Sequence, residues 1–253
     1  MVKGRQKMAK YKCIISYDGA NFAGFQIQPK QRTIQGEIEA ALTKMEKRPI
    51  RIYSSGRTDT GVHAKGQTFH FESSLTIANE QWKRALNTLL PGDIYVHSVE
   101  EVAQTFHARF DAVEKEYRYF VYTSRERDVF KRNYAYHFPH SLNLTAILEG
   151  CHHLEGEHDF TTFSSAKATA KGSRVRTLTK VTCQQNEDNF EFIVRGNGFL
   201  YHMVRIIVGV LLDIGTGKLL PDNIPKLLAA KDRRLAGDTA PPEGLYLWEV
   251  TYE

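Results

Sequence analysis

Cysteine is scarce in this 253-residue chain, and the few cysteines lie far apart. No two of them have the Cys-x-x-Cys spacing, so neither a zinc ribbon nor a disulfide framework is expected. An odd number of widely spaced cysteines indicates a reducing compartment, and we predict a cytoplasmic protein. The cysteines are Cys13, Cys151 and Cys183.

Long hydrophobic segments are also missing. The most apolar stretch, residues 199–214, contains His202 and Arg205 and falls short of the ~20 apolar residues needed to cross a bilayer. The apolar run at residues 13–15 is too short for the hydrophobic region of a signal peptide. We therefore expect no membrane partner, and we predict that the basic, polar residues 1–9 form a flexible tail.

The composition is that of a soluble globular protein with a modest basic surplus. Hydrophobic residues make up 42% and charged residues 25%, which excludes disorder as the global state. Lysine and arginine total 34 against 29 acidic residues, a formal charge of +5. This surplus favours nucleic acid or another anionic partner without identifying one. At about 150 residues per domain, the length allows one large domain or two small ones.

Hydrophobic periodicity predicts a β-α-β-β-α-β order in the first half, which is typical of ferredoxin-like or RRM-like units. The predicted elements are strands at residues 10–17, 50–53, 67–71 and 94–102, a helix capped by Thr33, and a helix from about Asn79 that stops at Pro91. The second half repeats this order without repeating the sequence. Its predicted elements are strands at 117–122, 178–183, 190–194 and 246–252, a short apolar piece at 134–138, and helices through 144–151 and from about Leu200 and Asn223.

These elements predict an α+β fold of two β-α-β-β-α-β subdomains. We expect an N-terminal subdomain over residues 10–108 and a C-terminal subdomain over residues 109–253. The two would form either a cleft or a continuous, mostly antiparallel sheet. No Pro/Gly/Ser-rich linker separates them, so we expect the junction near residues 106–112 to be packed.

The most informative segment is the loop SSGRTDTGVHA at residues 54–64, between two predicted strands. Its bracketing glycines allow sharp turns and a close approach to a ligand. Arg57 and Asp59 stand two residues apart within it, and loops on a rigid scaffold often carry catalytic groups. The tripeptide Asp-Thr-Gly also has ordinary turn chemistry, so on these residues alone both interpretations stay open.

Three other motifs are rejected. Asp-Thr-Gly marks aspartic proteases, but these need two carboxylates that share one proton, and this chain has one such tripeptide with basic neighbours. The segment at residues 215–218 resembles a phosphate loop, but Leu212 and Leu219 occupy positions that require Gly and Ser or Thr. The cluster at residues 151–153 with His158 lacks a second ligand pair, so no metal is expected.

Two further features are an arginine on an apolar helix and a segment rich in basic residues. Arg205 lies on a mostly apolar predicted helix, and a buried arginine needs a partner. Asp213, two turns on, is too distant for a good helical pair, and a carboxylate from elsewhere such as Asp59 is the alternative. Residues 160–186 contain five basic side chains and no acidic one, which fits either an RNA contact or a solvated surface loop.

Six segments, in order, resemble the tRNA pseudouridine synthase A family over residues 11–252. They are Tyr17-Asp18-Gly19 with residues 22–28, then 56–64, 87–94, 106–119, 196–205 and 240–245. The departures are small: Phe25 stands where the family often has Trp, and Thr60 where Ala is common.

The resemblance implies the pseudouridine synthase fold with a central catalytic cleft. It also implies an isomerase that converts uridine to pseudouridine at positions 38–40 of the tRNA anticodon stem-loop. The reaction needs no cofactor, and the family acts as a homodimer with tRNA contacting both subunits. Because the target base is paired or stacked, it must be flipped out before its glycosidic bond is reachable.

Residue roles follow from the resemblance, position by position. Asp59 matches the catalytic aspartate, and whether it attacks the sugar, attacks the uracil or removes a sugar proton stays open. Arg205 matches its arginine partner and Tyr117 the aromatic that stacks on the uracil. Arg57 matches the residue that displaces the base, and Leu245 an apolar wall of the uracil pocket. Further predicted substrate-binding residues are Gln26, His63, Lys65, Arg109, Lys167, Lys171 and Arg174.

Two alternative functions belong to other classes. A catalytically silent RNA-binding protein of the same fold would not need a carboxylate close to phosphates that repel it. An enzyme that removes the base would release free uracil, and glycosidases usually use two carboxylates where we place only one.

Overall fold

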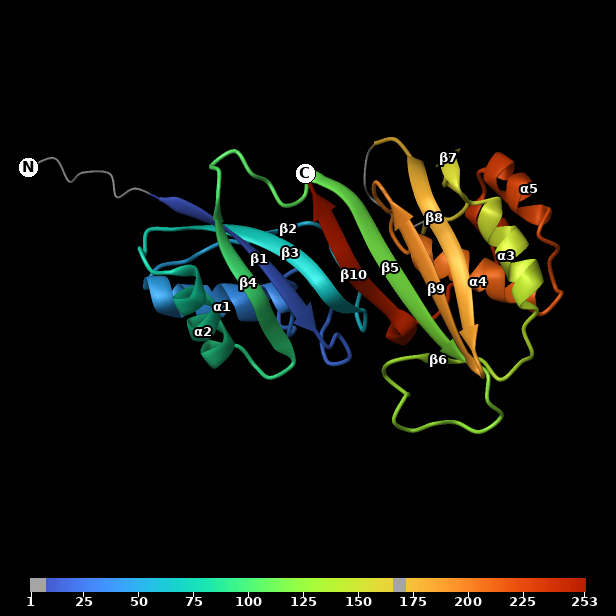
Figure 1. The fold of residues 1–253 in the computed structure, drawn as a ribbon, viewed down its shortest axis with the longest axis horizontal. Coiled ribbons are helices and arrows are strands. Elements are labelled where there is room, and N and C mark those ends of the chain that lie inside the picture. The colour runs from blue at the N-terminus through green and yellow to red at the C-terminus, as the bar shows by residue number, and fades with distance from the viewer. Residues whose placement is uncertain (1–7, 166–171) are drawn as a thin grey trace, which may run out of the picture. The chain divides into compact units, whose positions relative to one another are not determined.

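The computed structural model describes residues 8–165 and 172–253 (Figure 1). These residues form ten β-strands and five α-helices, and the strands pair mostly antiparallel, with β5 and β6 parallel. The predicted α+β class is confirmed. The chain divides into two compact units: Met1–Val113 with Leu247–Glu253, and Glu114–Tyr246. In the part of the chain that is described, no helix is long and apolar enough to span a membrane.

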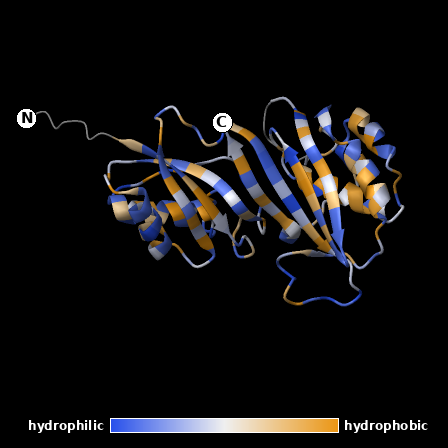
Figure 2. Ribbon diagram, viewed as in Figure 1, coloured by the Kyte–Doolittle hydropathy of each residue, from blue (hydrophilic) through white to orange (hydrophobic). Residues whose placement is uncertain are grey.

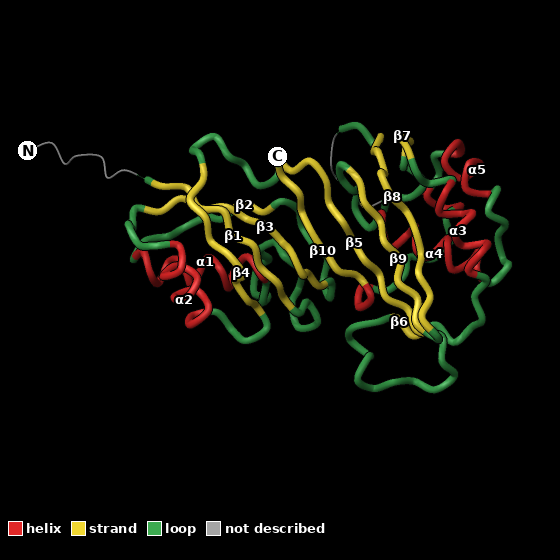
Figure 3. The backbone as a smooth tube through the Cα atoms, viewed as in Figure 1, coloured by secondary structure: helices red, strands yellow, loops and turns green. Residues whose placement is uncertain are grey.

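The first unit follows the predicted β-α-β-β-α-β order. Its elements are β1 (Ala9–Tyr17), α1 (Ile34–Glu46), β2 (Tyr53–Ser54), β3 (His63–Ser73), α2 (Asn79–Leu89) and β4 (Ile94–Val102). β1 pairs with both β3 and β4, and β2 adds to β3. Tyr11 and Phe71 on neighbouring strands pack against Trp82 of α2, which places this helix on the buried face of the sheet (Figure 3).

The second unit holds most of the elements that follow. They are β5 (Ala112–Tyr122), β6 (Tyr136–His137), α3 (Leu144–His152), β7 (Gly156–Asp159), β8 (Val175–Asn186), β9 (Asn189–Gly196), α4 (Met203–Gly215) and α5 (Asn223–Ala230), with two short 3₁₀ turns after α5. The strand order is β5-β9-β8-β7, with β6 parallel to β5. α4 is apolar nearly all round, and Figure 2 shows the alternation of hydropathy along β8 and β9.

Local chemistry explains the best predicted boundaries. Thr33 caps α1 because its Oγ1 accepts a hydrogen bond from the amide of Gly36, 3.2 Å away. Pro91 follows directly after α2 and its C-cap Leu90, and Ile94–Val102 is a strand as predicted.

Elsewhere the structure corrects the prediction. Residues 50–52 are not a strand, because the amides of Ile50 and Ile52 bond the side chains of Thr43 and Glu39 on α1. α4 begins at Met203 rather than Leu200, because His202 has a left-handed φ of 62°. β7 was not predicted, since its four residues are mostly polar.

The division into units differs in detail from the predicted subdomains. It falls after Val113, and the last strand, β10 (Leu245–Tyr252), lies mostly in the first unit. β10 is the hydrogen-bonded neighbour of β3, and Gly66 on β3 permits a close approach, because a Cβ there would lie 2.5 Å from the carbonyl oxygen of Trp248. The predicted tail at residues 1–9 lies largely outside the described residues. Its last residue, Ala9, belongs to β1 and pairs with Ser73 of β3.

Candidate functional site

The Asp59 loop (residues 54–64) links β2 to β3 in the first unit. The amide of Val62 donates to the carbonyl of Asp59 at 3.1 Å, and Gly61 has a left-handed φ of 79°. Asp59 therefore stands at the first position of a tight turn, half-buried, while Arg57 is exposed. Asp59 therefore has the turn position that the tripeptide Asp-Thr-Gly favours, and this position is also compatible with a catalytic role.

Buried groups hold the backbone on the N-terminal side of Asp59. The carbonyl of Thr58 accepts from the amide of Phe25 at 3.0 Å, and its hydroxyl lies 2.7 Å from that of Tyr17. Gln67 donates to the carbonyl of Gly56 at 3.0 Å. Burial raises the pKa of Tyr17 to about 12, so this phenol keeps its proton and can donate.

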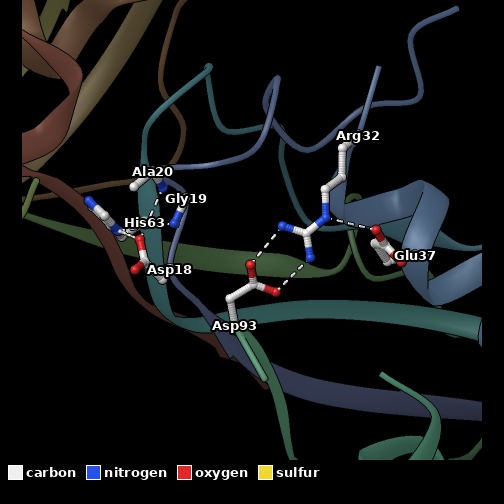
Figure 4. Close-up of polar contacts among 7 residues, drawn as sticks. All are labelled: Asp18, Gly19, Ala20, Arg32, Glu37, His63 and Asp93. Atoms are coloured by element: carbon white, nitrogen blue, oxygen red, sulfur yellow. Dashed lines mark hydrogen bonds and ion pairs between the residues drawn. The ribbon is translucent and has the colours of Figure 1, made fainter. Parts of the chain in front are cut away.

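His63 holds the other side of the loop (Figure 4). It is buried, and its Nδ1 accepts a hydrogen bond from the amide of Gly19 at 3.0 Å, with a carboxylate oxygen of Asp18 3.2 Å away. A Cβ on Gly19 would lie 1.9 Å from the carbonyl oxygen of Val62, so only glycine fits there. This holding role of His63 and Gly19 was missed, because nothing in the local sequence pairs two residues so far apart.

The other predicted substrate contacts of the first unit are exposed. Gln26, Lys65 and Arg109 all have exposed side chains. Arg109 lies 5.8 Å from the ring centroid of Phe110, which is 74% exposed. Tyr53, 47% exposed, belongs to the same aromatic surface through His107, and this surface was not predicted.

In the second unit, Tyr117 lies on β5 and is buried. Its ring packs edge-on against Phe199 with centroids 4.9 Å apart. Two residues on, the hydroxyl of Tyr119 donates to the carbonyl of Pro241 at 2.7 Å. A Cβ on Gly244 would lie 2.7 Å from the Tyr119 ring, so the chain entering Leu245 is packed against β5. Burial and, less strongly, Glu243 raise the pKa of Tyr119.

Arg205 on α4 is fixed at one end of its guanidinium. Its Nε donates to the carbonyl of Ala240 at 2.7 Å, and the amide of Ala240 donates back to the carbonyl of Arg205 at 3.1 Å. One turn further, a Cβ on Gly209 would lie 2.2 Å from the carbonyl oxygen of Asp238, so this stripe of α4 faces the segment before Ala240. Asp213, the local alternative partner, accepts from Lys218 at 3.1 Å.

The basic segment at residues 160–186 is only partly described. Lys167 and Lys171 lie outside the described residues. Arg174 is half-buried, its Nη1 donates to the hydroxyl of Ser164 at 3.0 Å, and its carbonyl accepts from Phe160. Arg174 therefore joins the two ends of the segment whose middle carries both lysines.

The residues of the rejected metal motif lie at the end of α3 and on β7. Cys151 is buried on α3, His152 is exposed, and Nε2 of His158 lies 2.8 Å from the carbonyl of Glu155. Within residues 8–165 and 172–253, no group of three or more His, Cys, Asp and Glu side chains could hold a metal ion.

Comparison with known proteins shows the family of this chain. The profile described as "tRNA pseudouridine synthase" matches residues 13–111 and 151–253, which include both the Asp59 loop and Arg205. A tRNA pseudouridine synthase A from Oceanobacillus iheyensis is 56% identical over 247 residues, 97% of this chain and 98% of that protein. Proteins of the same name from Geobacillus kaustophilus and Bacillus subtilis are 55% and 52% identical, covering 96% of this chain and 95% and 99% of theirs. This chain therefore belongs to the tRNA pseudouridine synthase family.

Proposed function

We propose that this protein is a tRNA pseudouridine synthase that isomerises uridine to pseudouridine at positions 38–40 of the anticodon stem-loop. The observation that carries the proposal is the family match over both units together with the rigidly held Asp59 loop. In the reaction the N1 glycosidic bond breaks, the uracil turns, and its C5 is joined to the sugar. The hydrogen on C5 leaves as a proton, so no redox partner or cofactor is required.

Asp59 is the proposed catalytic carboxylate. Its neighbours on both sides are fixed, Thr58 by Phe25 and Val62 by the turn closed on Asp59 itself. A carboxylate on such a backbone is positioned before the substrate arrives. Each chemical route, attack on the sugar, attack on the uracil or removal of a sugar proton, needs this group ionised.

Arg205 is the proposed partner of Asp59. Because its Nε is bonded to Ala240, its two Nη groups are the donors that we assign to the carboxylate. A guanidinium fork would hold the carboxylate both charged and oriented.

Tyr117 and Leu245 are the proposed walls of the uracil site, and Arg57 the residue that takes the place of the flipped base. Tyr117 and Leu245 are buried, whereas Arg57 is exposed, as a group that must enter a base stack needs to be. The predicted phosphate and substrate contacts, Gln26, His63, Lys65, Arg109, Lys167, Lys171 and Arg174, complete the proposed RNA surface.

We further propose that the protein acts in the cytoplasm as a homodimer. The cytoplasmic assignment is supported by Cys13, Cys151 and Cys183, which are buried and unpaired. The dimer is inferred from the family resemblance, and light scattering of the purified protein at assay concentration tests it.

Mapping of the product tests the proposed specificity. tRNA transcripts with a single anticodon-arm uridine at position 38, 39 or 40, and matched transcripts with that uridine elsewhere in the arm, are incubated with the enzyme. We expect pseudouridine in the first set only, with no free uracil. Free uracil would indicate an enzyme that removes the base, and tight binding with no product would indicate a silent RNA-binding protein.

A further inference from the structure

A second loop supports the Asp59 loop. This support loop (residues 18–33) joins β1 to α1, and three hydrogen bonds of backbone amides link it to the Asp59 loop. The amide of Gly19 donates to His63 at 3.0 Å, that of Phe25 to Thr58 at 3.0 Å, and that of Gly61 to the carbonyl of Phe22 at 3.4 Å. The support loop therefore helps to hold the backbone on both sides of Asp59, together with the contacts of Tyr17 and Gln67.

Asp93 bonds the support loop at both of its ends, and Figure 4 shows its carboxylate bonded to Arg32. Its backbone carbonyl accepts from the amide of Asp18 at 3.0 Å. Its carboxylate receives the guanidinium fork of Arg32, with Nη1–Oδ2 2.7 Å and Nη2–Oδ1 2.9 Å. A residue in the turn before β4 thus closes a loop that begins and ends elsewhere in the sequence.

Arg32 also contacts residues in the middle of the support loop. Its carbonyl accepts from the amide of Ala23 at 2.9 Å, and its guanidinium carbon lies 4.1 Å from the ring centroid of Phe22. The carbonyl of Phe22 is the one that Gly61 bonds. Glu37 on α1 accepts a further hydrogen bond from the guanidinium at 2.9 Å. A lysine could supply the charge but not the planar fork or the stacking.

We propose that Arg32 and Asp93 are positioning residues that set the geometry of Asp59 without touching the uracil. This rests on the proposed function of Asp59. Their pair links the turn before β4 to the support loop, and the support loop in turn carries the bonds to Thr58, Gly61 and His63. A small displacement of a catalytic group is costly to the rate, about 10²-fold for roughly 1 Å.

The test uses Arg32→Lys, Asp93→Asn and the double variant, with the full-length protein and a tRNA transcript. We expect each single variant to lower the single-turnover rate of pseudouridine formation at least about tenfold while the Kd for tRNA stays within about twofold. The double variant should be no slower than the worse single one, because both remove the same link. Asp232→Asn is the matched control, since it breaks an Arg–Asp fork with Arg234 in the second unit.

Amide hydrogen exchange gives a readout that does not depend on activity. In Arg32→Lys, the amides of Gly19, Phe25 and Gly61 should exchange faster than in the wild type, and Asp232→Asn should leave them unchanged. Unchanged exchange and rates in the Arg32 and Asp93 variants would overturn the proposal, as would a change in Kd alone, which would make Arg32 an RNA contact. A wild type that makes no pseudouridine would instead overturn the proposed function, and the exchange result would still decide the positioning role.

Discussion

Arg205 shows at the scale of one residue how a helix can present a charge. Its Nε is held by the carbonyl of Ala240 at 2.7 Å, on a helix whose other faces are buried in the second unit. A guanidinium fixed at one atom loses little further freedom when the remaining nitrogens meet a carboxylate. This is the physical basis for the proposal that Arg205 pairs with Asp59.

Replacing Arg205 with methionine tests that assignment. The apolar stem of methionine can fill the same volume, so the free energy of unfolding should fall by only about 1–2 kcal/mol for the missing hydrogen bond. The single-turnover rate of pseudouridine formation should fall roughly 10²-fold or more, as on removal of a group that stabilises charge in a site. Denaturant titration and product mapping measure the two effects, and an unchanged rate would remove Arg205 from the mechanism.

His70 gives a prediction about pH. Burial, with the nearby charges of His107 and Lys10, lowers the pKa of His70 to about 4, and its Nδ1 accepts from the amide of Ala108 at 3.1 Å. In the unfolded chain the group titrates near its ordinary 6.5. Between these values the unfolded chain binds a proton that the folded chain does not. The stabilisation is therefore complete above about pH 6.5 and is lost as the pH falls towards 4.

His70→Asn isolates this contribution, because asparagine keeps an acceptor for Ala108 but does not titrate. We expect the free energy of unfolding of the wild type to fall more steeply between pH 6.5 and 4 than that of the variant. Urea titrations at several pH values measure both slopes. Parallel slopes would show that His70 does not titrate differently in the two states.

At the scale of elements, a close approach of two loops requires one particular glycine. A Cβ on Gly19 would meet the carbonyl oxygen of Val62 at 1.9 Å, whereas a Cβ on Gly92 would have nothing within 4 Å. Gly19→Ala should therefore push the Asp59 loop aside, at a cost of about 1–3 kcal/mol in stability and a larger proportional loss of rate. Gly92→Ala is the control and should change stability by about 0.5 kcal/mol or less. Equal effects of the two variants on the rate would contradict this account.

The elements also show where sequence patterns predict well. Thr33 and Pro91 mark the ends of helices by their own chemistry, and the alternation in Ile94–Val102 defines a strand. Ile50 and Ile52 carry the same apolar pattern as a strand, but side chains of α1 bond their amides. Such competition between a strand partner and a helix side chain is decided by tertiary structure and is not visible in a pattern.

For the candidate site, the sequence identified residues but not their supports. The family motifs mark Asp59, Tyr117 and Arg205, and the structure describes the surroundings of each within its own unit. Arg32 and Asp93 are 61 positions apart, and no local rule joins them. His63 was predicted as a substrate contact, and its bond to Gly19 adds a holding role that only the fold reveals.

At the scale of the whole molecule, a net charge of +5 supports binding to RNA without locating it. Alanine at Lys167, Lys171 and Arg174 together should weaken tRNA binding and flatten the dependence of log Kd on log salt, by nearly one in slope for each phosphate that is no longer neutralised. Binding titrations between low and moderate salt measure this slope. A slope equal to that of the wild type would show that these three side chains do not contact phosphates of the tRNA.

Tritium release from tRNA that carries uridine labelled at C5 tests directly whether Asp59 catalyses uridine isomerisation. Wild type and Asp59→Ala are compared side by side, with free uracil and tRNA binding measured in the same samples. We expect tritium release by the wild type without free uracil, and no release by Asp59→Ala although it folds and binds tRNA. Release by Asp59→Ala at a rate near that of the wild type would contradict this expectation.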